Sequence, residues 1–307
     1  MRLFMTSLAL CAAAIPLQAH AWGNDGHMAV AEVAWNHMSP AAQAHAAALL
    51  KLNPDYAIWT AGVSPQDQDR VAFLHAATWP DSIKSNKAYT DDGYTPADPH
   101  AGDMGDYTDL VMHKGWHFID MPFSPDGTPT EPPFATNAVT QITRAEANLG
   151  SASASDQTKS YSLNWLLHLV GDIHQPLHAT SRYTAAFPHG DVGGNSVHAC
   201  LATCEKGDNL HKFWDDLPGR SNSVAAVDHY VSTLSPADPA NVSVQDPAAW
   251  ASESEKLAEA KAYAAPIGTT DKVYHLTRSY AKAAAAVAAL RVELAGERLA
   301  AILNASL

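Results

Sequence analysis

The stretch of sequence that decides the fold is Tyr161-Ser-Leu-Asn-Trp-Leu-Leu-His168-Leu-Val-Gly-Asp172-Ile-His-Gln-Pro176-Leu-His178. It is rich in apolar side chains up to Asp172, which predicts a buried helix, and Pro176 limits the extension of that helix. His168 and Asp172 stand four residues apart, so a helix projects both from one face, within reach of a shared cation. The sequence therefore predicts a buried helix that carries a candidate metal-binding pair.

The remaining segments predict further helices joined by loops. The expected helices cover residues 26–50, with a break at Ser39-Pro40, and residues 67–77, 137–149, 209–215 and 272–304. An apolar stripe on the last helix is expected to face the core: Leu276, Tyr280, Ala283, Val287, Leu290 and Leu294. Long loops are expected over residues 85–109 and 124–133. The predicted class is all-α, a single compact helical domain with long loops and a small β-hairpin over residues 193–208.

The first 21 residues have the features of a secretory signal peptide. Arg2 precedes an apolar stretch over residues 3–17, and Ala19-His-Ala21 forms a small-residue cleavage site. The apolar stretch is too short for a membrane anchor, and polar residues soon follow it. We therefore expect cleavage between Ala21 and Trp22, export to the periplasm or the medium, and a mature domain of residues 22–307 without stable membrane association.

Net charge, histidine content and cysteine content each bear on function. The net charge of −13 argues at first against nucleic acid, because polyanion binding usually draws on a basic surface, although bound cations would change this locally. The 16 histidines are more than composition explains. Only Cys200 and Cys204 follow the expected cleavage site, and in an oxidising compartment such a close pair favours a local disulfide. The sequence alone leaves open whether the two are bridged.

The spacing of His168 and Asp172 recurs at His211 and Asp215. A single pair of this kind is common on surfaces or as a satisfied core histidine. Two pairs beside a further histidine, His178, make that interpretation less favourable.

Two more segments place polar side chains in apolar surroundings. His117 lies in Trp116-His-Phe-Ile-Asp120, where an uncompensated ring would be costly, and Asp81 follows Trp79-Pro. Imidazole and carboxylate without thiolate form the ligand set expected of catalytic zinc that keeps positions open for water.

The expected mature N-terminus, Trp22-Gly-Asn-Asp-Gly-His27, supplies another candidate. A free α-amino group has a pKa of about 7.7–8.0, so it can lose its proton near neutral pH and bind a metal. The alternative is that Trp22 is simply an apolar end that packs into the core. The sequence favours neither interpretation.

Taken in order from Trp22 to about Asp215, these motifs together with Val192-Gly-Gly-Asn195 resemble the zinc-dependent type I nucleases of the S1/P1 family. The wider superfamily has the same all-α fold and includes bacterial zinc phospholipases C. The resemblance implies three zinc ions. Their implied ligands are Asp81, His117, His168 and Asp172 for the first, Asp172, His27 and the amine and carbonyl of Trp22 for the second, and His178, His211 and Asp215 for the third.

The resemblance also implies catalytic roles for Asp172, which would join two ions, and for Lys84, which would offset charge on the phosphoryl oxygens. Lys84 stands where the family usually has Arg, so the bidentate fork of a guanidinium is lost.

The family's base-binding residues have counterparts here as well. Phe118 and Val192 would sandwich a nucleobase, Asp120 would bind its edge and Asn195 would line the pocket. Stacking tolerates every base, and the edge is free only in an unpaired base. Single-stranded DNA and RNA are therefore the expected substrates, with little sequence specificity. The resemblance also implies 3′-mononucleotides as substrates and 5′-phosphate products. Because the metals would attract the phosphate, we expect a shallow salt dependence.

Two other functions stay open. A zinc phospholipase C would share the metal ligands, but such enzymes typically have Glu at the position of Asp215 and lack the segments around Phe118 and Asn195. A non-catalytic zinc-binding protein would require closed four-ligand sites, whereas these ligand sets are partly open. The chain is expected to act as a monomer.

Overall fold

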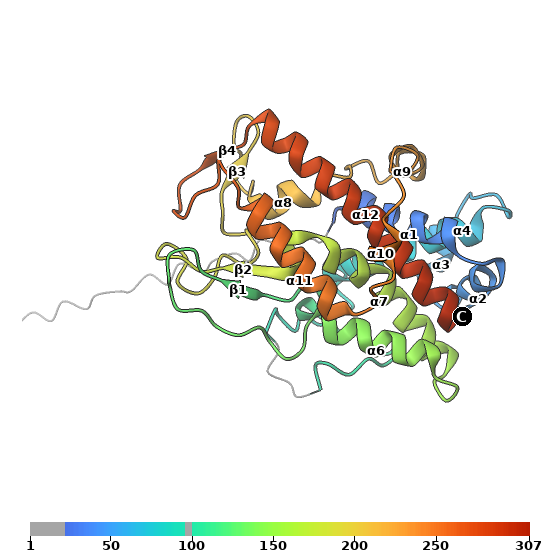
Figure 1. Cartoon of the computed structure of the whole chain (residues 1–307). Helices are drawn as coiled ribbons and strands as arrows, with labels where there is room; N and C mark the ends of the chain where they lie inside the picture. The colour runs from blue at the N-terminus through green and yellow to red at the C-terminus, as the bar shows by residue number, and fades with distance from the viewer. Residues whose placement is uncertain (1–21, 96–99) are drawn as a thin grey trace, which may run out of the picture.

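The computed structural model describes residues 22–95 and 100–307, and Figure 1 shows their arrangement. The predicted signal peptide lies outside the described residues. Helices dominate the architecture, and strands within the described residues occur only as two short parallel pairs. The predicted all-α class is confirmed.

The first described helices follow the expected pattern. They are α1 (Asn24–His37), α2 (Pro40–Leu50), α3 (Tyr56–Trp59), α4 (Gln68–Ala76) and α5 (Trp79–Ser82). The predicted break at Ser39-Pro40 is real, because the Ser39 side chain accepts the N–H of Ala42 and Pro40 occupies the first position of α2. No helix forms over residues 86–95 and 100–113, as expected for this loop.

Helix α7 (Asp156–His174) forms the centre of the molecule, and every residue from 160 to 174 is buried. The Ser155 side chain caps its start by accepting the N–H of Thr158, and Pro176 follows its end. It contacts α1, α2, α6 (Ala138–Gly150), α11 (Pro247–Leu257) and α12 (Arg278–Ser306). This enclosure fixes the position of any side chain that α7 presents.

Helix α12 crosses the molecule beside α1 (Figure 1). The apolar stripe predicted for this segment is partly wrong. Tyr280, Val287 and Leu294 are buried, whereas Ala283 is exposed and Leu290 is 62% exposed; Leu276 is buried but lies before the helix. The contact with α1 instead uses small side chains, and a Cβ on Gly296 would overlap Val33 of α1. Close approach of the two helices therefore selects the face of α12 that is buried.

The remaining helical segments are short. They are α8 (Leu210–Asp215), α9 (Val224–Val231) and α10 (Pro239–Val242), with the 3-10 segments η1 (Ile83–Ser85), η2 (Lys114–His117) and η3 (Pro176–Ala179) and the π-helical η4 (Ala258–Ala262). Within the described residues, no helix combines the length and apolar character needed to cross a membrane.

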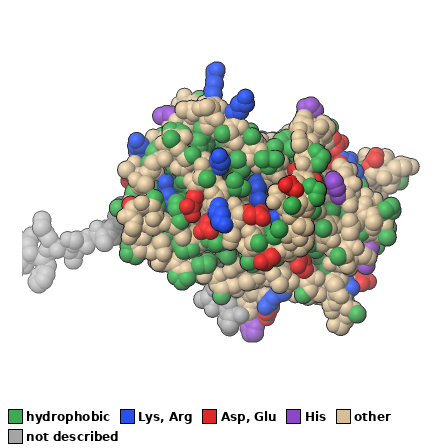
Figure 2. Space-filling view, in the orientation of Figure 1, with side chains coloured by type: hydrophobic (Ala, Val, Ile, Leu, Met, Phe, Trp, Pro, Cys, Tyr) green, Lys and Arg blue, Asp and Glu red, His purple; other side chains and the backbone are tan. Residues whose placement is uncertain are grey.

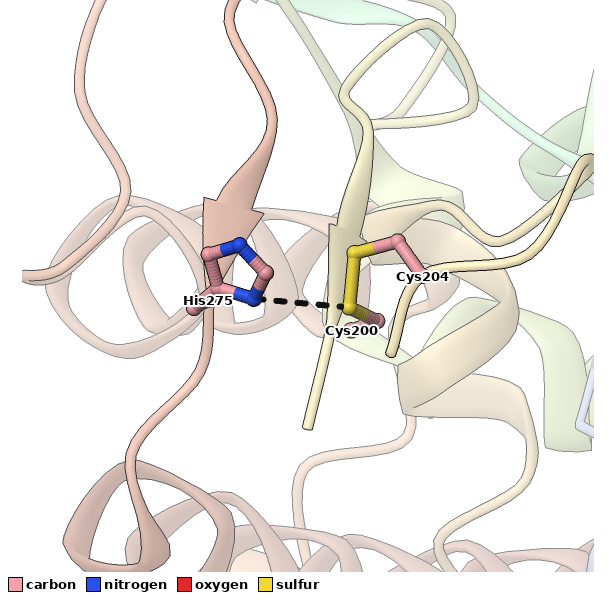
Figure 3. Close-up of side chains that lie close together, drawn as sticks. All are labelled: Cys200, Cys204 and His275. Atoms are coloured by element: carbon pink, nitrogen blue, oxygen red, sulfur yellow. Dashed lines mark hydrogen bonds between the residues drawn. A yellow bond between two sulfur atoms is a disulfide. The ribbon is translucent and has the colours of Figure 1, made fainter. Parts of the chain in front are cut away.

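The predicted hairpin over residues 193–208 is wrong. Strand β3 (Ala199–Cys200) pairs in parallel with β4 (Tyr274–His275), just before α12, and β1 (Met121–Phe123) pairs in parallel with β2 (Thr180–Arg182). Parallel strands cannot be joined by a tight turn, so the pairing partner came from a distant segment. The chain after β3 is closed locally by the Cys200–Cys204 disulfide, which lies beside His275 of β4 (Figure 3).

Candidate metal centre

Five buried His and Asp side chains from four elements meet around Asp172. We call them the Asp172 group: His27 of α1, Asp81 of α5, His117 of η2, and His168 and Asp172 of α7. Asp172 Oδ1 lies 3.4 Å from His27 Nε2, while Asp172 Oδ2 lies 3.1 Å from His117 Nδ1 and 3.3 Å from His168 Nε2. The two oxygens of one carboxylate therefore face different histidines.

A glycine on α7 and a lysine beside Asp81 complete the surroundings of this group. Gly171 leaves room for His27, because a Cβ there would lie 3.0 Å from His27 Nδ1. Asp81 Oδ1 lies 3.7 Å from His168 Nε2, and the ammonium of Lys84, one turn further along the chain, lies 2.7 Å from the same oxygen.

A second set of side chains forms the Asp215 group: His178 of η3, and His211 and Asp215 of α8. His178 Nε2 and His211 Nε2 are 2.9 Å apart. Asp215 Oδ2 lies 3.5 Å from His211 Nε2, and Asp215 Oδ1 lies 3.9 Å from His178 Nε2. The three side chains converge on one point, as metal ligands do.

Backbone carbonyls orient three of the imidazoles. His168 Nδ1 lies 2.7 Å from Ala77 O, His178 Nδ1 lies 2.8 Å from His117 O, and His211 Nδ1 lies 2.7 Å from Gly193 O. When Nδ1–H donates to a carbonyl, the lone pair of Nε2 faces the centre and is available to a cation.

Gly193 itself adopts a φ of 57°, and a Cβ there would overlap the carbonyl oxygen of Leu177. A glycine at position 193 is thus required for the carbonyl that faces His211 Nδ1. Gln175 adds a further contact, since its side-chain amide donates to Asp215 Oδ1 over 2.7 Å.

The electrostatics suit a divalent cation. Burial lowers the pKa of His27 to about 3 and that of His168 to about 4, so both rings are neutral and can act as ligands. Burial raises the pKa of the carboxyls of Asp172 and Asp215, because a charge there lacks solvent. Burial alone would raise the pKa of Asp81 too, but the Lys84 ammonium and the nearby histidines hold it well below its usual range.

Unpaired polar atoms provide the test of fit. His27 Nε2 and Asp172 Oδ1, which face each other over 3.4 Å, are both buried without a hydrogen-bond partner in the described part of the chain. Such atoms are costly to bury unless something binds them. Bound metal ions would satisfy this donor set of neutral imidazoles and carboxylates.

Trp22 lies between the helices that carry the two groups. Its indole Nε1 donates to Gly171 O of α7 over 3.0 Å, and the N–H of Gly23 donates to Asp215 O of α8 over 2.9 Å. The indole is fully buried, as an apolar chain end would be. Coordination by the Trp22 amine stays a prediction.

A hollow beside both groups contains the four residues expected to bind a base: Phe118, Asp120, Val192 and Asn195. We call it the Phe118 pocket. Its wall also includes ligand candidates from each group and Lys84, so it opens directly toward them. Val192 has a φ of 55°, a conformation that is rare for a β-branched residue and therefore indicates a constrained wall.

Two residues of the Phe118 pocket were missed by the sequence analysis. The ring of Tyr94 lies 6.3 Å from that of Phe118, centre to centre, and the Lys114 ammonium lies 5.5 Å from the centre of the Tyr94 ring. Lys114 stands two residues before Trp116, which was a signal next to a recognised motif. Tyr94 belongs to the long loop, where no periodic pattern marks its position.

The described residues contain two other groupings of possible ligands. In the first, Cys200 and Cys204 lie near His275, but the two sulfurs are bonded to each other and offer no thiolate (Figure 3). The second, His37 with Glu293 and Glu297, lies partly in solvent. His174, within the motif on α7, is satisfied by Val170 O and Arg298 and has a structural role.

Comparison with known proteins supports the resemblance seen in the motifs. The profile of the family described as S1/P1 Nuclease matches residues 22–307, so the chain belongs to this family. Two plant relatives are similar in sequence. Endonuclease 3 of Arabidopsis thaliana is 27% identical over 64% of this chain and 54% of its own length, and Endonuclease 5 of the same plant is 26% identical over 64% of this chain and 55% of its own length. The chain thus spans about half the length of these relatives.

Proposed function

We propose that the protein is a zinc-dependent nuclease that hydrolyses phosphodiester bonds in single-stranded DNA and RNA, and releases phosphate from 3′-mononucleotides. One observation carries the proposal: the Phe118 pocket opens onto the side chains of both the Asp172 group and the Asp215 group. A base held there leaves its phosphate beside the candidate ligands. Family membership supports the same activity.

The proposed centre holds three zinc ions. The Asp172 group with the Trp22 amine would hold two of them and share Asp172, and the Asp215 group would hold the third. Bound zinc supplies Lewis-acid polarisation of the phosphate and acidifies water. The three ions outweigh the charge of the three carboxylates, which reconciles an acidic chain with a polyanionic substrate.

The protein's own side chains position the substrate. Phe118 offers a ring for stacking, and Asp120 offers a carboxyl to the edge of the base. Lys84 lines the same pocket at the side of Asp81, where its ammonium offsets charge on the phosphoryl oxygens. Water would attack phosphorus and the bond from phosphorus to the 3′-oxygen would break, so the 3′-oxygen leaves as a hydroxyl and the phosphate stays on the 5′-oxygen of the other product.

We also propose that residues 1–21 are a signal peptide, that residues 22–307 form the mature nuclease domain, and that it acts as a monomer outside the cytoplasm. The Cys200–Cys204 disulfide supports this location, because disulfides persist in oxidising compartments.

The test compares three substrates with purified, correctly processed protein: single-stranded DNA, a 3′-mononucleotide and a choline phospholipid, each with and without EDTA. We expect metal-dependent hydrolysis of the first two. Turnover of the phospholipid alone would assign a phospholipase C instead. Bound zinc without turnover of any substrate would indicate a zinc-binding protein.

A further inference from the structure

A second hollow borders the candidate metal centre and shares only Asn195 with the Phe118 pocket. Asp81 and Asp215 form part of its wall, and Asn195 borders both hollows. Lys212 of α8 and Arg220 also line it. We call this hollow the Lys212 trough.

The trough continues beyond these two cations. Lys212 and Arg220 also line a neighbouring hollow, which is bordered by the partly exposed ring of Phe213 and by Leu201, 51% exposed. The Phe118 pocket therefore adjoins the Lys212 trough at Asn195, and the trough adjoins this outer hollow at Lys212 and Arg220. Such a track is longer than a mononucleotide needs.

Lys212 and Arg220 form exposed ion pairs, both with Asp216. Lys212 Nζ lies 3.1 Å from Asp216 Oδ2, and Arg220 Nε lies 3.5 Å from the same oxygen, while the cationic side chains are 46% and 68% exposed. Exposed ion pairs of this kind contribute little stability, so both side chains can turn to another anion at low cost. Asp216 keeps them on the same side of the trough.

On the face that Figure 2 shows, Lys and Arg are interspersed with Asp and Glu. A single strand that passes over this acidic protein must therefore find its charge partners locally. A pair of cations beside the metal centre meets that requirement.

We propose that the Lys212 trough binds the part of a single strand that lies 3′ of the cleaved bond, with Lys212 and Arg220 contacting its backbone phosphates. This inference rests on the proposed nuclease function. With the nucleoside 5′ of the cleaved bond in the Phe118 pocket and the phosphate at the metals, the 3′ fragment must continue past the metals, and the trough is the separate hollow that borders Asp81 and Asp215. A 3′-mononucleotide has no such fragment and does not reach it.

The experiment compares Lys212→Ala/Arg220→Ala with the native enzyme on octathymidylate and on a 3′-mononucleotide. We expect kcat/KM for the octamer to fall by about 5–20-fold, mostly through KM, and its salt dependence to become shallower by about 1.4 log units per log unit, which is the loss of two phosphate contacts. The mononucleotide serves as the internal reference and should change less than twofold. Lys256→Ala/Lys261→Ala, which removes two exposed cations outside the trough, is the charge-matched control.

Each other outcome has a definite meaning. Equal losses on both substrates would show that α8 merely supports the metal centre, and no loss on either would show that the strand avoids the trough; both results overturn the inference. Native enzyme inactive on both substrates would refute the proposed function instead. Anisotropy with a labelled phosphorothioate octamer then still tests the trough, because equal affinity for native and variant protein would overturn it.

Discussion

The Asp172 group and the Asp215 group use the same two side-chain types, but the fold holds them differently. The first takes its members from α1, α5, η2 and α7, and its central carboxylate belongs to the most enclosed helix of the molecule. The second depends on η3 and on α8, a helix of only six residues. Both groups border the Phe118 pocket and the Lys212 trough. Core packing thus fixes the central carboxylate of the first group, whereas the second group is held by short elements. Changes in the two groups should therefore have effects of different size.

The largest effect is expected from Asp172→Ala, because the two oxygens of Asp172 face different histidines and would serve two ions. We expect activity to fall on the order of 10³-fold or more and metal content to fall by about two ions. Metal analysis and single-stranded DNA hydrolysis check this, with Asp172→Asn as the control of similar volume. Near-normal turnover in Asp172→Ala would contradict the shared role.

One additional residue before Trp22 should have the next largest effect. An amide nitrogen in place of the amine has a delocalised lone pair and cannot act as the ligand. We expect a folded protein with a weakened or missing ion in the Asp172 group and little activity, restored when the protein is trimmed to Trp22. Equal zinc content and equal rates in both forms would leave only the apolar-end interpretation of Trp22.

Asp215→Ala should have a narrower effect, because only the Asp215 group depends on it. We expect the loss of about one ion, with the pair at Asp172 retained. Gln175→Leu is the graded control: it removes the amide that donates to Asp215 Oδ1 and should weaken binding of that same ion by about 10–100-fold. Joint loss of all three ions in Asp215→Ala would mean that the two groups are not separate sites.

Phe118→Ala should leave both groups loaded, since this ring lies in the pocket and is not a ligand candidate. Loss of one stacking contact costs about 1–3 kcal/mol, so kcat/KM on single-stranded substrates should fall by about 5–150-fold at unchanged zinc content. Phe118→Tyr, which keeps the ring, is the control. Unchanged kinetics of Phe118→Ala on every homopolymer would place base binding elsewhere.

Features with a local signal could be predicted from the sequence. The pair His168 and Asp172 lies on one long helix, where a spacing of four residues places the two side chains close together. Both lie in the part of α7 that is buried throughout. The pair His211 and Asp215 was found by the same rule. The α9–α11 region was not anticipated, although its signal is local: Asp238 and Asp246 each precede a proline and cap a helix by accepting a backbone N–H.

Non-local features could not be predicted. The partner of β3 is a distant strand, and a two-residue parallel pair has no pattern of its own. Tyr94 reaches the Phe118 pocket through a loop whose path depends on tertiary contacts, such as the ion pair between Lys114 and Asp91. The joining of Asp81 to the Asp172 group likewise depends on how α5 packs against α7.

The smallest expected effect concerns stability in the Phe118 pocket. Burial, with the nearby carboxylate of Asp191, raises the pKa of Asp120 to about 7. Between about pH 4 and pH 7 the folded protein therefore binds a proton that the unfolded chain has released, so this residue lowers stability as pH rises through that window. Asp120→Asn cannot ionise and should gain in Tm relative to the native protein, on the order of 2–4 °C at pH 8 and less at pH 5.

Asp126→Asn provides a comparison of opposite sign. Asp126 accepts the N–H of Ala185 and contacts from Thr128, which lower its pKa to about 2, so its stabilising contribution is present at neutral pH and is lost as pH falls toward that value. Asp126→Asn should therefore lose Tm at pH 8, where Asp120→Asn gains it. Thermal unfolding of both variants at the two pH values checks the pair. If Asp120→Asn gave the same Tm difference from the native protein at pH 5 and pH 8, Asp120 would titrate as a solvated carboxylate, and its recessed position in the pocket would have no electrostatic consequence.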